Sequence, residues 1–262
     1  ERDADKSPVL ECIDLGITFG GLKAVDNFNV TIGRTEITGL IGPNGAGKTT
    51  VFNLLTKVYQ PTHGTILLNG KDIHDLNTAQ VNRAGIARTF QNIRLFGELS
   101  VEENITVAMD TQMHYTMPEG IFRLPRFWKE ERIVHERAME LLSIFHMEDL
   151  AKAKASSLPY GAQRRLEILR ALATNPSLLL LDEPAAGMNP SETAELMENI
   201  RSIRDTFKIA VLLIEHDMNL VMNICEGIAV LNFGHVIAKG TPEDIQNNPE
   251  VIEAYLGKQK EA

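Results

Sequence analysis

The first third of the chain alternates short apolar runs with turns. Residues 9–13, 28–32 and 64–70 are rich in β-branched and other apolar side chains, and such runs predict strands. We expect them to form a partly antiparallel sheet. The run 36–41 is more apolar and predicts a buried strand, and residues 49–59 carry apolar side chains at helical spacing. The order is therefore strand, glycine-rich loop and helix.

The middle of the chain has a helical pattern from about residue 102 to 155. In residues 132–145 charged side chains lie on one side of the expected helix and apolar ones on the other. We interpret this part as an inserted helical lobe. Its apolar side comprises Ala138, Leu141, Leu142 and Phe145.

Residues 111–126 interrupt this helical pattern with Pro118, Gly120 and Pro125. Such residues favour a loop or a mobile helical hairpin. Aromatic side chains stand in or beside the segment, and they are either exposed or close the core of the lobe itself. They are Tyr115, Phe122, Phe127 and Trp128.

The last third has the pattern of parallel βαβ units. Two strongly apolar runs, 178–181 and 209–214, are separated by a charged helical stretch, 191–204. Residues 241–245 begin with a threonine cap, a proline and acidic residues, which predict the start of a final, structural helix. The fold class is therefore α/β.

Composition excludes several function classes. The 262 residues carry a formal net charge of -9, which argues against broad electrostatic binding of nucleic acid. No run approaches the roughly 20 apolar residues of a membrane-spanning helix, and the charged N-terminus does not resemble a secretion signal. Cys12 and Cys225 have no metal-ligand spacing, so we interpret them as core residues of a cytosolic protein.

The glycine-rich loop after the run 36–41 predicts nucleotide binding. Its glycines let successive N–H groups and the next helix N-terminus face the phosphates of ATP. Lys48 is expected on the β- and γ-phosphates, the Thr49 hydroxyl on Mg²⁺, and Thr50 near the α-phosphate. The loop comprises Gly42, Pro43, Asn44, Gly45, Ala46, Gly47, Lys48, Thr49 and Thr50.

Polar residues follow other expected strands. Asp182 and Glu183 end a buried run, at the strand end where α/β proteins bind ligands. Asp182 suits Mg²⁺, and Glu183 suits the general base that polarises the attacking water. Gln91 and His216 also follow strands or turns, and His216 is a candidate to hydrogen-bond the γ-phosphate.

In this order the motifs resemble the ATP-binding subunits of ATP-binding cassette (ABC) transporters, over nearly the whole chain. The resemblance adds Phe19 as the aromatic residue that stacks on adenine. It identifies a signature segment in Leu158, Pro159, Tyr160, Gly161, Ala162 and Gln163, and a dimer-facing loop in Gly187, Met188 and Asn189.

The resemblance implies a fold and a site. The fold is a P-loop NTPase core with a RecA-like parallel sheet, an N-terminal antiparallel β subdomain and an inserted α-helical lobe. The implied domains are 1–92 with 165–262 for the core and 93–164 for the lobe, within one ABC transporter domain of about 8–242. The implied catalytic residues are Glu183, His216, Gln91 and Lys48, and the implied Mg²⁺ ligands are Thr49, Gln91 and Asp182.

The resemblance also implies partners. Two such subunits close on two ATP molecules, and each nucleotide contacts the loop of one chain and the signature of the other. Closure moves two transmembrane permease subunits, with residues 93–104 near the surface that receives a coupling helix. The second subunit is a shorter ABC ATPase or a second copy of this chain. An extracytoplasmic substrate-binding protein takes part indirectly, and the chain is peripheral, on the cytoplasmic face of the inner membrane.

The motifs around Gln91, Glu183 and His216, with the insertion after Met109, resemble the longer ATPase of the branched-chain amino-acid uptake branch. Leucine, isoleucine and valine are the implied cargo. Urea or amide importers, other amino-acid importers and lipid exporters stay open, because the ATPase does not touch the cargo. A DNA-repair or ribosomal ABC ATPase is disfavoured because no duplicated cassette or long coiled-coil insertion appears. A nucleotide-binding switch without turnover is a further alternative.

The chain departs from the family pattern at three positions. Pro159 replaces the usual signature serine, Ala162 replaces a usual glutamine, and Asn189 replaces a frequent aspartate. Proline offers neither a hydroxyl nor an N–H. We therefore expect the ATP site completed by this signature to be the weaker hydrolytic site.

Overall fold

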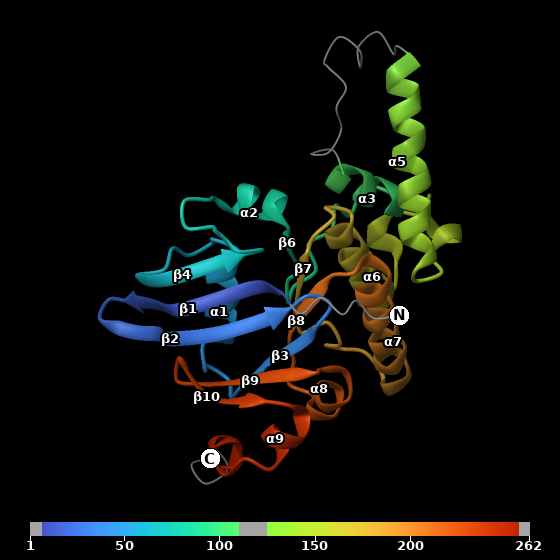
Figure 1. Ribbon diagram of the computed structural model, residues 1–262. Coiled ribbons are helices and arrows are strands. Elements are labelled where there is room, and N and C mark those ends of the chain that lie inside the picture. The colour runs from blue at the N-terminus through green and yellow to red at the C-terminus, as the bar shows by residue number, and fades with distance from the viewer. Residues whose placement is uncertain (1–6, 110–124, 257–262) are drawn as a thin grey trace. The chain divides into compact units, whose positions relative to one another are not determined.

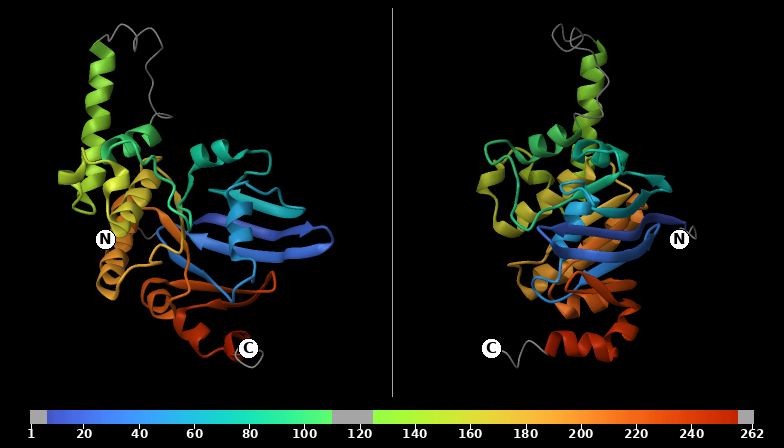
Figure 2. Two further views of the ribbon diagram at one scale, coloured as in Figure 1. Left: turned by 180° about the vertical axis from the view of Figure 1, so that it is seen from behind. Right: turned by 90° about the vertical axis from the view of Figure 1, so that its left-hand side faces the viewer.

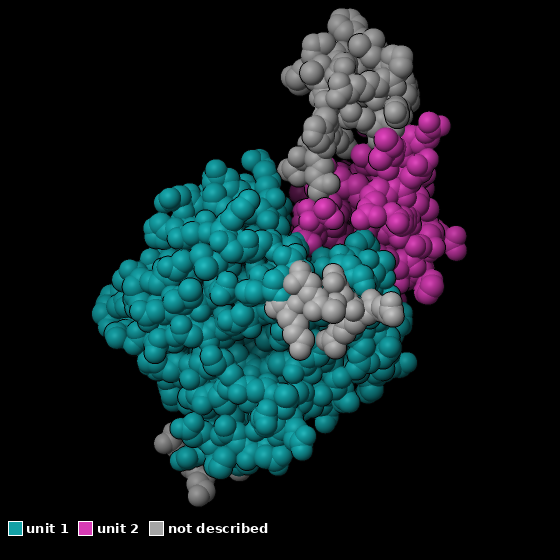
Figure 3. Space-filling view, in the orientation of Figure 1, with its two compact units in different colours: residues 1–91, 177–262 teal, residues 92–176 magenta. Residues whose placement is uncertain are grey.

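The protein, described by a computed structural model over residues 7–109 and 125–256, divides into two compact units (Figure 1 and Figure 3). Unit 1 comprises residues 1–91 and 177–262, and unit 2 comprises residues 92–176. The sequence placed the second boundary at 164–165. In the structure that point lies inside one continuous helix, α6 (Tyr160–Leu172), so the compact unit extends past it.

Unit 1 contains the antiparallel sheet that the sequence predicts. Its strand order is β2-β1-β4-β5. The strands β1 and β2 are longer than the apolar runs, and their pairing continues through several register shifts. The strands are β1 (Pro8–Phe19), β2 (Leu22–Gly33), β4 (His63–Leu68) and β5 (Lys71–Asp72).

The second sheet of unit 1 is mainly parallel, with the order β10-β9-β3-β8-β7-β6. Among the described strands of this sheet, only β10 pairs antiparallel, with β9. Because β3, β8, β7 and β6 are parallel neighbours, their carboxyl ends meet at one edge of the sheet. The strands are β3 (Ile37–Ile41), β6 (Ile86–Arg88), β7 (Leu178–Asp182), β8 (Ala210–Ile214), β9 (Gly227–Asn232) and β10 (His235–Gly240).

One hydrophobic core contains residues of both sheets and of α1. Figure 2 shows the ribbon from two further directions. Phe28 of β2, Phe52 of α1 and Leu180 of β7 are members of it and are at most 1% exposed. The helices of unit 1 are α1 (Lys48–Leu55), α2 (Thr78–Ala84), α7 (Pro190–Phe207), α8 (Met218–Ile224), α9 (Pro242–Gln246) and α10 (Pro249–Leu256).

The C-terminal helix start is confirmed. Thr241 caps α9 through a capping box with Asp244, and Pro242 is at the first turn. It is not the last helix, however, because α10 follows it. Cys12 and Cys225 are both buried with free thiols, and burial raises the pKa of Cys12 to about 12, as expected of core residues.

Unit 2 is helical, as predicted. It contains α3 (Val101–Met109), α5 (Pro125–Ser143), α6 and two short 3-10 helices, Glu148–Leu150 and Ala155–Ser157. The four residues of the predicted apolar side, Ala138, Leu141, Leu142 and Phe145, are each at most 2% exposed. The predicted end of the irregular segment at residue 126 is wrong, since Pro125 and Arg126 belong to α5. Its residues 111–124, with Tyr115 and Phe122, lie outside the described residues, as do the side chains of Phe127 and Trp128.

Within the described ranges, no helix is both long enough and apolar enough to span a bilayer.

Candidate functional site

The glycine-rich loop 42–47 leaves the carboxyl end of β3 and leads into α1. Three of its glycines, Gly42, Gly45 and Gly47, have positive φ angles of 153°, 78° and 107°. A Cβ atom on Gly42 would lie 2.0 Å from the Leu231 carbonyl oxygen, so no other residue fits there without a shift in the backbone. Asn44 and Gly45 are exposed, and the loop is thus a backbone cradle open to a ligand.

The start of α1 has the electrostatics of an anion site. Gly47 at the N-cap provides no side-chain cap, and the first turn contains no acidic residue. The N–H groups of such a turn favour a negatively charged ligand. The Lys48 ammonium is buried and donates to the carbonyl oxygens of Gly42 (2.6 Å) and Pro43 (3.0 Å), while the side chain of Thr49 is exposed. This donor set fits a nucleotide's phosphates.

Three of the predicted residues meet around one carboxylate. The His216 Nε2 atom lies 2.8 Å from the Glu183 Oε1 atom. The Gln91 amide donates to the other carboxylate oxygen of Glu183, at 3.0 Å. The three residues follow the adjacent strands β8, β7 and β6, so the parallel pairing brings them together at the sheet edge where the glycine-rich loop also begins.

Asp182 is held by a residue to which the sequence analysis gave no role. The Arg88 guanidinium forms a buried ion pair with Asp182 at 2.9 Å, with side chains only 6% and 5% exposed. It also donates to Asn53 of α1 at 2.7 Å and stacks over the rings of Phe52 and Phe90. Arg88 therefore connects the end of β7 with the helix after the glycine-rich loop.

Glu215 is the second residue that received no role. It is 5% exposed and continues the fully buried strand β8. Its two oxygens accept the backbone N–H groups of Ala185 (2.9 Å) and His216 (3.2 Å). Burial raises the pKa of Glu215, and the nearby charge of Glu183 raises it further. The two hydrogen bonds lower the pKa, but they do not cancel this rise. In the sequence, the position of a charged residue directly after an apolar run is a weak signal for such a role.

The adenine candidate Phe19 ends β1 and is 45% exposed. Its ring packs edge to face against Tyr59, with centroids 5.2 Å apart. One face of an exposed, supported ring is suited to stacking on a flat base.

The signature segment lies in unit 2, at the start of α6. Pro159 is the N-cap, and no side chain caps the helix there. The first turn has no acidic residue, so its N–H groups suit an anion. The Gln163 side chain donates to the Leu158 carbonyl at 2.9 Å. The fully buried Arg164 donates to the Tyr160 hydroxyl and forms an ion pair with Glu167. These contacts hold the side chain of Tyr160 in the first turn against the next turn of the helix.

The loop 187–189 leads into α7. The Asn189 side chain accepts the Glu192 N–H, and Glu192 accepts the Asn189 N–H in return, at 3.0 Å each. Asparagine and aspartate cap helices about equally well, so the departure at Asn189 preserves the cap.

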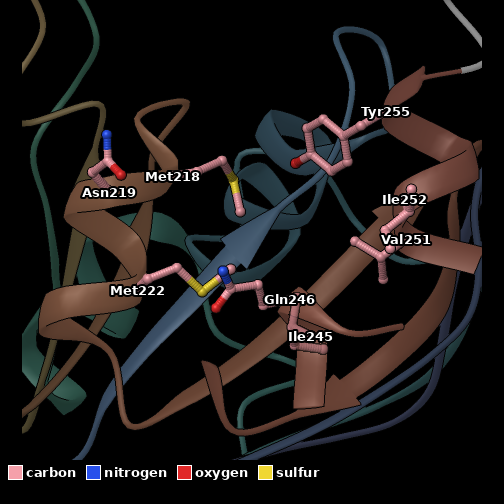
Figure 4. Close-up of a pocket in the computed structure, with 8 residues that line it drawn as sticks. All are labelled: Met218, Asn219, Met222, Ile245, Gln246, Val251, Ile252 and Tyr255. Atoms are coloured by element: carbon pink, nitrogen blue, oxygen red, sulfur yellow. The ribbon is translucent and has the colours of Figure 1, made fainter. Parts of the chain in front are cut away.

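A separate cavity of about 340 Å³ lies among α8, α9 and α10 (Figure 4). Tyr255 points into it from α10, and the backbone of Gly42 forms a hydrogen bond with the Tyr255 side chain. Burial raises the pKa of Tyr255, and this hydrogen bond opposes the rise. The residues that line the cavity are Met218, Asn219, Met222, Ile245, Gln246, Val251, Ile252 and Tyr255.

No group of three or more His, Cys, Asp or Glu residues in the described ranges is arranged to hold a metal by itself. The oxygen atoms of Thr49, Gln91 and Asp182 are nevertheless the kind of donor that Mg²⁺ takes beside substrate phosphates. Thr49 and Gln91 are exposed, whereas Asp182 is buried in its ion pair with Arg88.

Comparison with known proteins agrees with this geometry. A family model described as ABC transporter matches residues 25–186, and one described as branched-chain amino acid ATP-binding cassette transporter matches residues 235–261. The chain is 48% identical to the high-affinity branched-chain amino acid transport ATP-binding protein BraF of Pseudomonas aeruginosa, over 95% of this chain and 98% of BraF. It is 49% identical to the corresponding protein LivG of Escherichia coli K12, with the same coverage.

Among solved structures, the ADP conformation of MJ1267, an ATP-binding cassette of an ABC transporter, superimposes with a TM-score of 0.83 at 30% identity. The superposition covers 96% of this chain and 99% of that one. With a family match over more than half of its length, the chain belongs to the ABC transporter family and has the fold of its ATP-binding domain.

Proposed function

We propose that this protein is the ATP-hydrolysing subunit of an ABC importer that powers the uptake of leucine, isoleucine and valine. The observation that supports hydrolysis is the cluster of Glu183, His216 and Gln91 at the sheet edge where the glycine-rich loop begins. The likeness to BraF and LivG, at 48% and 49% identity, supports the cargo.

The loop 42–50 binds the phosphates of ATP in this proposal. Its N–H groups and the start of α1 face the negative charge, and Lys48 exchanges the carbonyl oxygens of Gly42 and Pro43 for phosphate oxygens. Phe19 stacks on the adenine. Such stacking contributes on the order of 1 kcal/mol and is tolerant of the base, so other purine nucleotides bind too.

Glu183 is the general base of the proposed reaction. Its carboxylate accepts the proton of the attacking water as the γ-phosphoryl group leaves. His216 and Gln91 hold both carboxylate oxygens, which restricts the rotation of the side chain. When ATP is bound, His216 also donates to the γ-phosphate.

Mg²⁺ is the proposed metal, held by Thr49, Gln91 and Asp182 together with the phosphates. When bound, it neutralises charge on the β- and γ-phosphates. Arg88 keeps the carboxylate of Asp182 at the strand end, where the metal is expected.

The proposed assembly is a dimer in which residues 158–163 of one subunit complete the ATP site of the other. The start of α6 has uncapped N–H groups for this purpose. Two permease subunits, a shorter ABC ATPase or a second copy, and indirectly an extracytoplasmic binding protein complete the transporter. The chain then lies on the cytoplasmic face of the inner membrane.

The variant Glu183→Gln tests hydrolysis. We expect it to bind ATP, lose turnover by at least about 100-fold, and accumulate as a closed dimer, because the amide cannot accept the proton. Turnover is measured by phosphate release and dimerisation by size-exclusion chromatography with ATP. The control is Glu198→Gln on α7, whose side chain is 72% exposed and should not affect turnover. A Glu183→Gln variant that turns over like the parent would indicate a passive nucleotide switch.

Co-purification from membranes tests the cargo. The proposal expects two different permease subunits, a shorter ATPase and a binding protein that captures leucine. A binding protein for urea or amides, or a lipid-transporting partner, would contradict the branched-chain assignment and leave the ATPase assignment intact.

A further inference from the structure

Two loops converge on the proposed general base. Residues 183–186 follow β7, and residues 215–217 follow β8. The Glu183 N–H donates to the Ile214 carbonyl oxygen at 2.9 Å, so the first loop continues the pairing of β7 with β8 by one more bond. The side chains of Glu183 and His216 then meet beyond it, at 2.8 Å.

Glu183 has an unusual backbone. Its φ angle is +49°, in the left-handed region that costs a side-chain-bearing residue free energy. Such a conformation persists only where the surrounding structure holds it. Here it turns the chain directly after a buried strand, and the hydrogen bond from the Ala186 N–H to the Glu183 carbonyl closes the turn at 3.2 Å.

Glu215 connects the two loops at this turn. One carboxylate oxygen accepts the Ala185 N–H at 2.9 Å, and the other accepts the His216 N–H at 3.2 Å. The side chain is buried, so water cannot replace either bond without cost. An ionised carboxylate has two acceptor oxygens and no donor, which matches the two N–H groups. A glutamine side chain has only one acceptor oxygen, and its NH₂ group is a donor.

We propose that Glu215 is a positioning residue of the hydrolysis site. By joining the backbone of the turn at Glu183 to the backbone of His216, it holds the general base and its histidine partner in register. This rests on the proposed function, because it assigns Glu215 to the same reaction. Glu215 does not touch the nucleotide in this proposal, and binding of ATP through the loop 42–50 is independent of it.

The test compares Glu215→Gln and Glu215→Asp with the parent, in the complete protein with its co-purified membrane subunits. Glutamine presents an N–H₂ group to one of the two N–H donors, and aspartate retracts the carboxylate by one methylene group. We expect kcat for ATP to fall about tenfold to hundredfold for the glutamine variant, as loss of a hydrogen bond to a charged group implies, and less for the aspartate variant. The dissociation constant of ATP should stay within about twofold.

Glu36→Gln is the matched control. Glu36 also accepts a backbone N–H, from Gly33 at 2.8 Å, but it precedes β3, at the amino end of the same sheet. A purely structural carboxylate of this kind should leave kcat unchanged. If Glu215→Gln does not fold, the aspartate variant, which retains the charge, provides the same comparison.

Two results would overturn the inference. One is an unchanged kcat in a folded Glu215 variant, and the other is a parallel loss of kcat and ATP affinity, which indicates general damage. The Glu183→Gln variant distinguishes a failure of this inference from a failure of the proposed function. If Glu183→Gln loses turnover and the Glu215 variants do not, only the role of Glu215 fails; if Glu183→Gln retains turnover, the proposed hydrolysis site fails as well.

Discussion

The buried ion pair between Arg88 and Asp182 gives the sharpest prediction for stability. Replacing Arg88 by methionine removes the guanidinium and leaves the Asp182 carboxylate buried, since the two side chains are only 6% and 5% exposed. Breaking one side of a buried pair costs about 3 to 5 kcal/mol. The variant also loses the hydrogen bond to Asn53 and the stacking on Phe52 and Phe90.

One feature of the pair reduces its net contribution. The Arg88 Nε atom is buried without a hydrogen-bond partner in the part of the chain that the structure describes, which costs about 1 to 3 kcal/mol in the parent. We therefore expect Arg88→Met to lower the free energy of unfolding by about 3 kcal/mol, near the lower end of the range. Urea denaturation followed by circular dichroism measures it.

The double variant Arg88→Met/Asp182→Asn identifies the cause. Because the asparagine has no charge to leave unpaired, the double variant should be more stable than Arg88→Met alone by at least about 1 kcal/mol. Arg137→Met is the control, since the Arg137–Glu140 pair is exposed and should contribute less than about 1 kcal/mol. A loss below about 1 kcal/mol for Arg88→Met, or a double variant no more stable than it, would refute the reasoning.

Two further predictions concern unit 2. Pro159→Ser should raise ATP turnover of the reconstituted transporter severalfold. The reason is that a serine hydroxyl adds a phosphate contact worth about 1.5 to 3 kcal/mol at an N-cap without a side-chain hydrogen bond. Unchanged turnover would show that Pro159 does not make the two ATP sites unequal. Burial alone would raise the pKa of Glu102, but hydrogen bonds from Lys152 and His135 outweigh it and lower the pKa below its usual value. The stabilisation by these hydrogen bonds is therefore fully present above the usual pKa of 4.5 and is lost as the pH falls through the lower folded-state pKa. Glu102→Gln should therefore lose less thermal stability on acidification than the parent. An identical acid response of the two proteins would argue against a contribution from the contacts of Glu102 with Lys152 and His135.

The sequence predicts most of the strands and helices that have a strong apolar pattern, although it misses β9, whose residues 228–231 are apolar and buried. It also misses elements without such a pattern. The apolar runs before Asp182 and His216 are buried strands, since only a two-sided core accepts such runs. The strand β6, three residues long, and the edge strand β10, which is only partly buried, have no such pattern. They are set by pairing with their neighbours, which a local window does not reveal.

The same distinction applies to the site. A loop rich in glycine, and a pair of adjacent carboxylates at the end of an apolar run, indicate chemistry by residue type alone. These patterns predict the loop 42–50 and Glu183. Arg88 and Glu215 act through the partners that the fold brings to them, Asp182 in one case and two backbone N–H groups in the other. Their contribution depends on tertiary contacts between strands, and residue type gives only a weak signal for it.

The contact between Tyr255 and Gly42 joins two parts of the chain that match different family models. Tyr255 lies within the segment that matches the branched-chain family model, and Gly42 lies within the segment that matches ABC transporters in general. A residue of the part that matches the branched-chain model is thus in direct contact with the part that matches the general ABC transporter model. Removing α10 would therefore remove a side chain that touches the first residue of the phosphate loop.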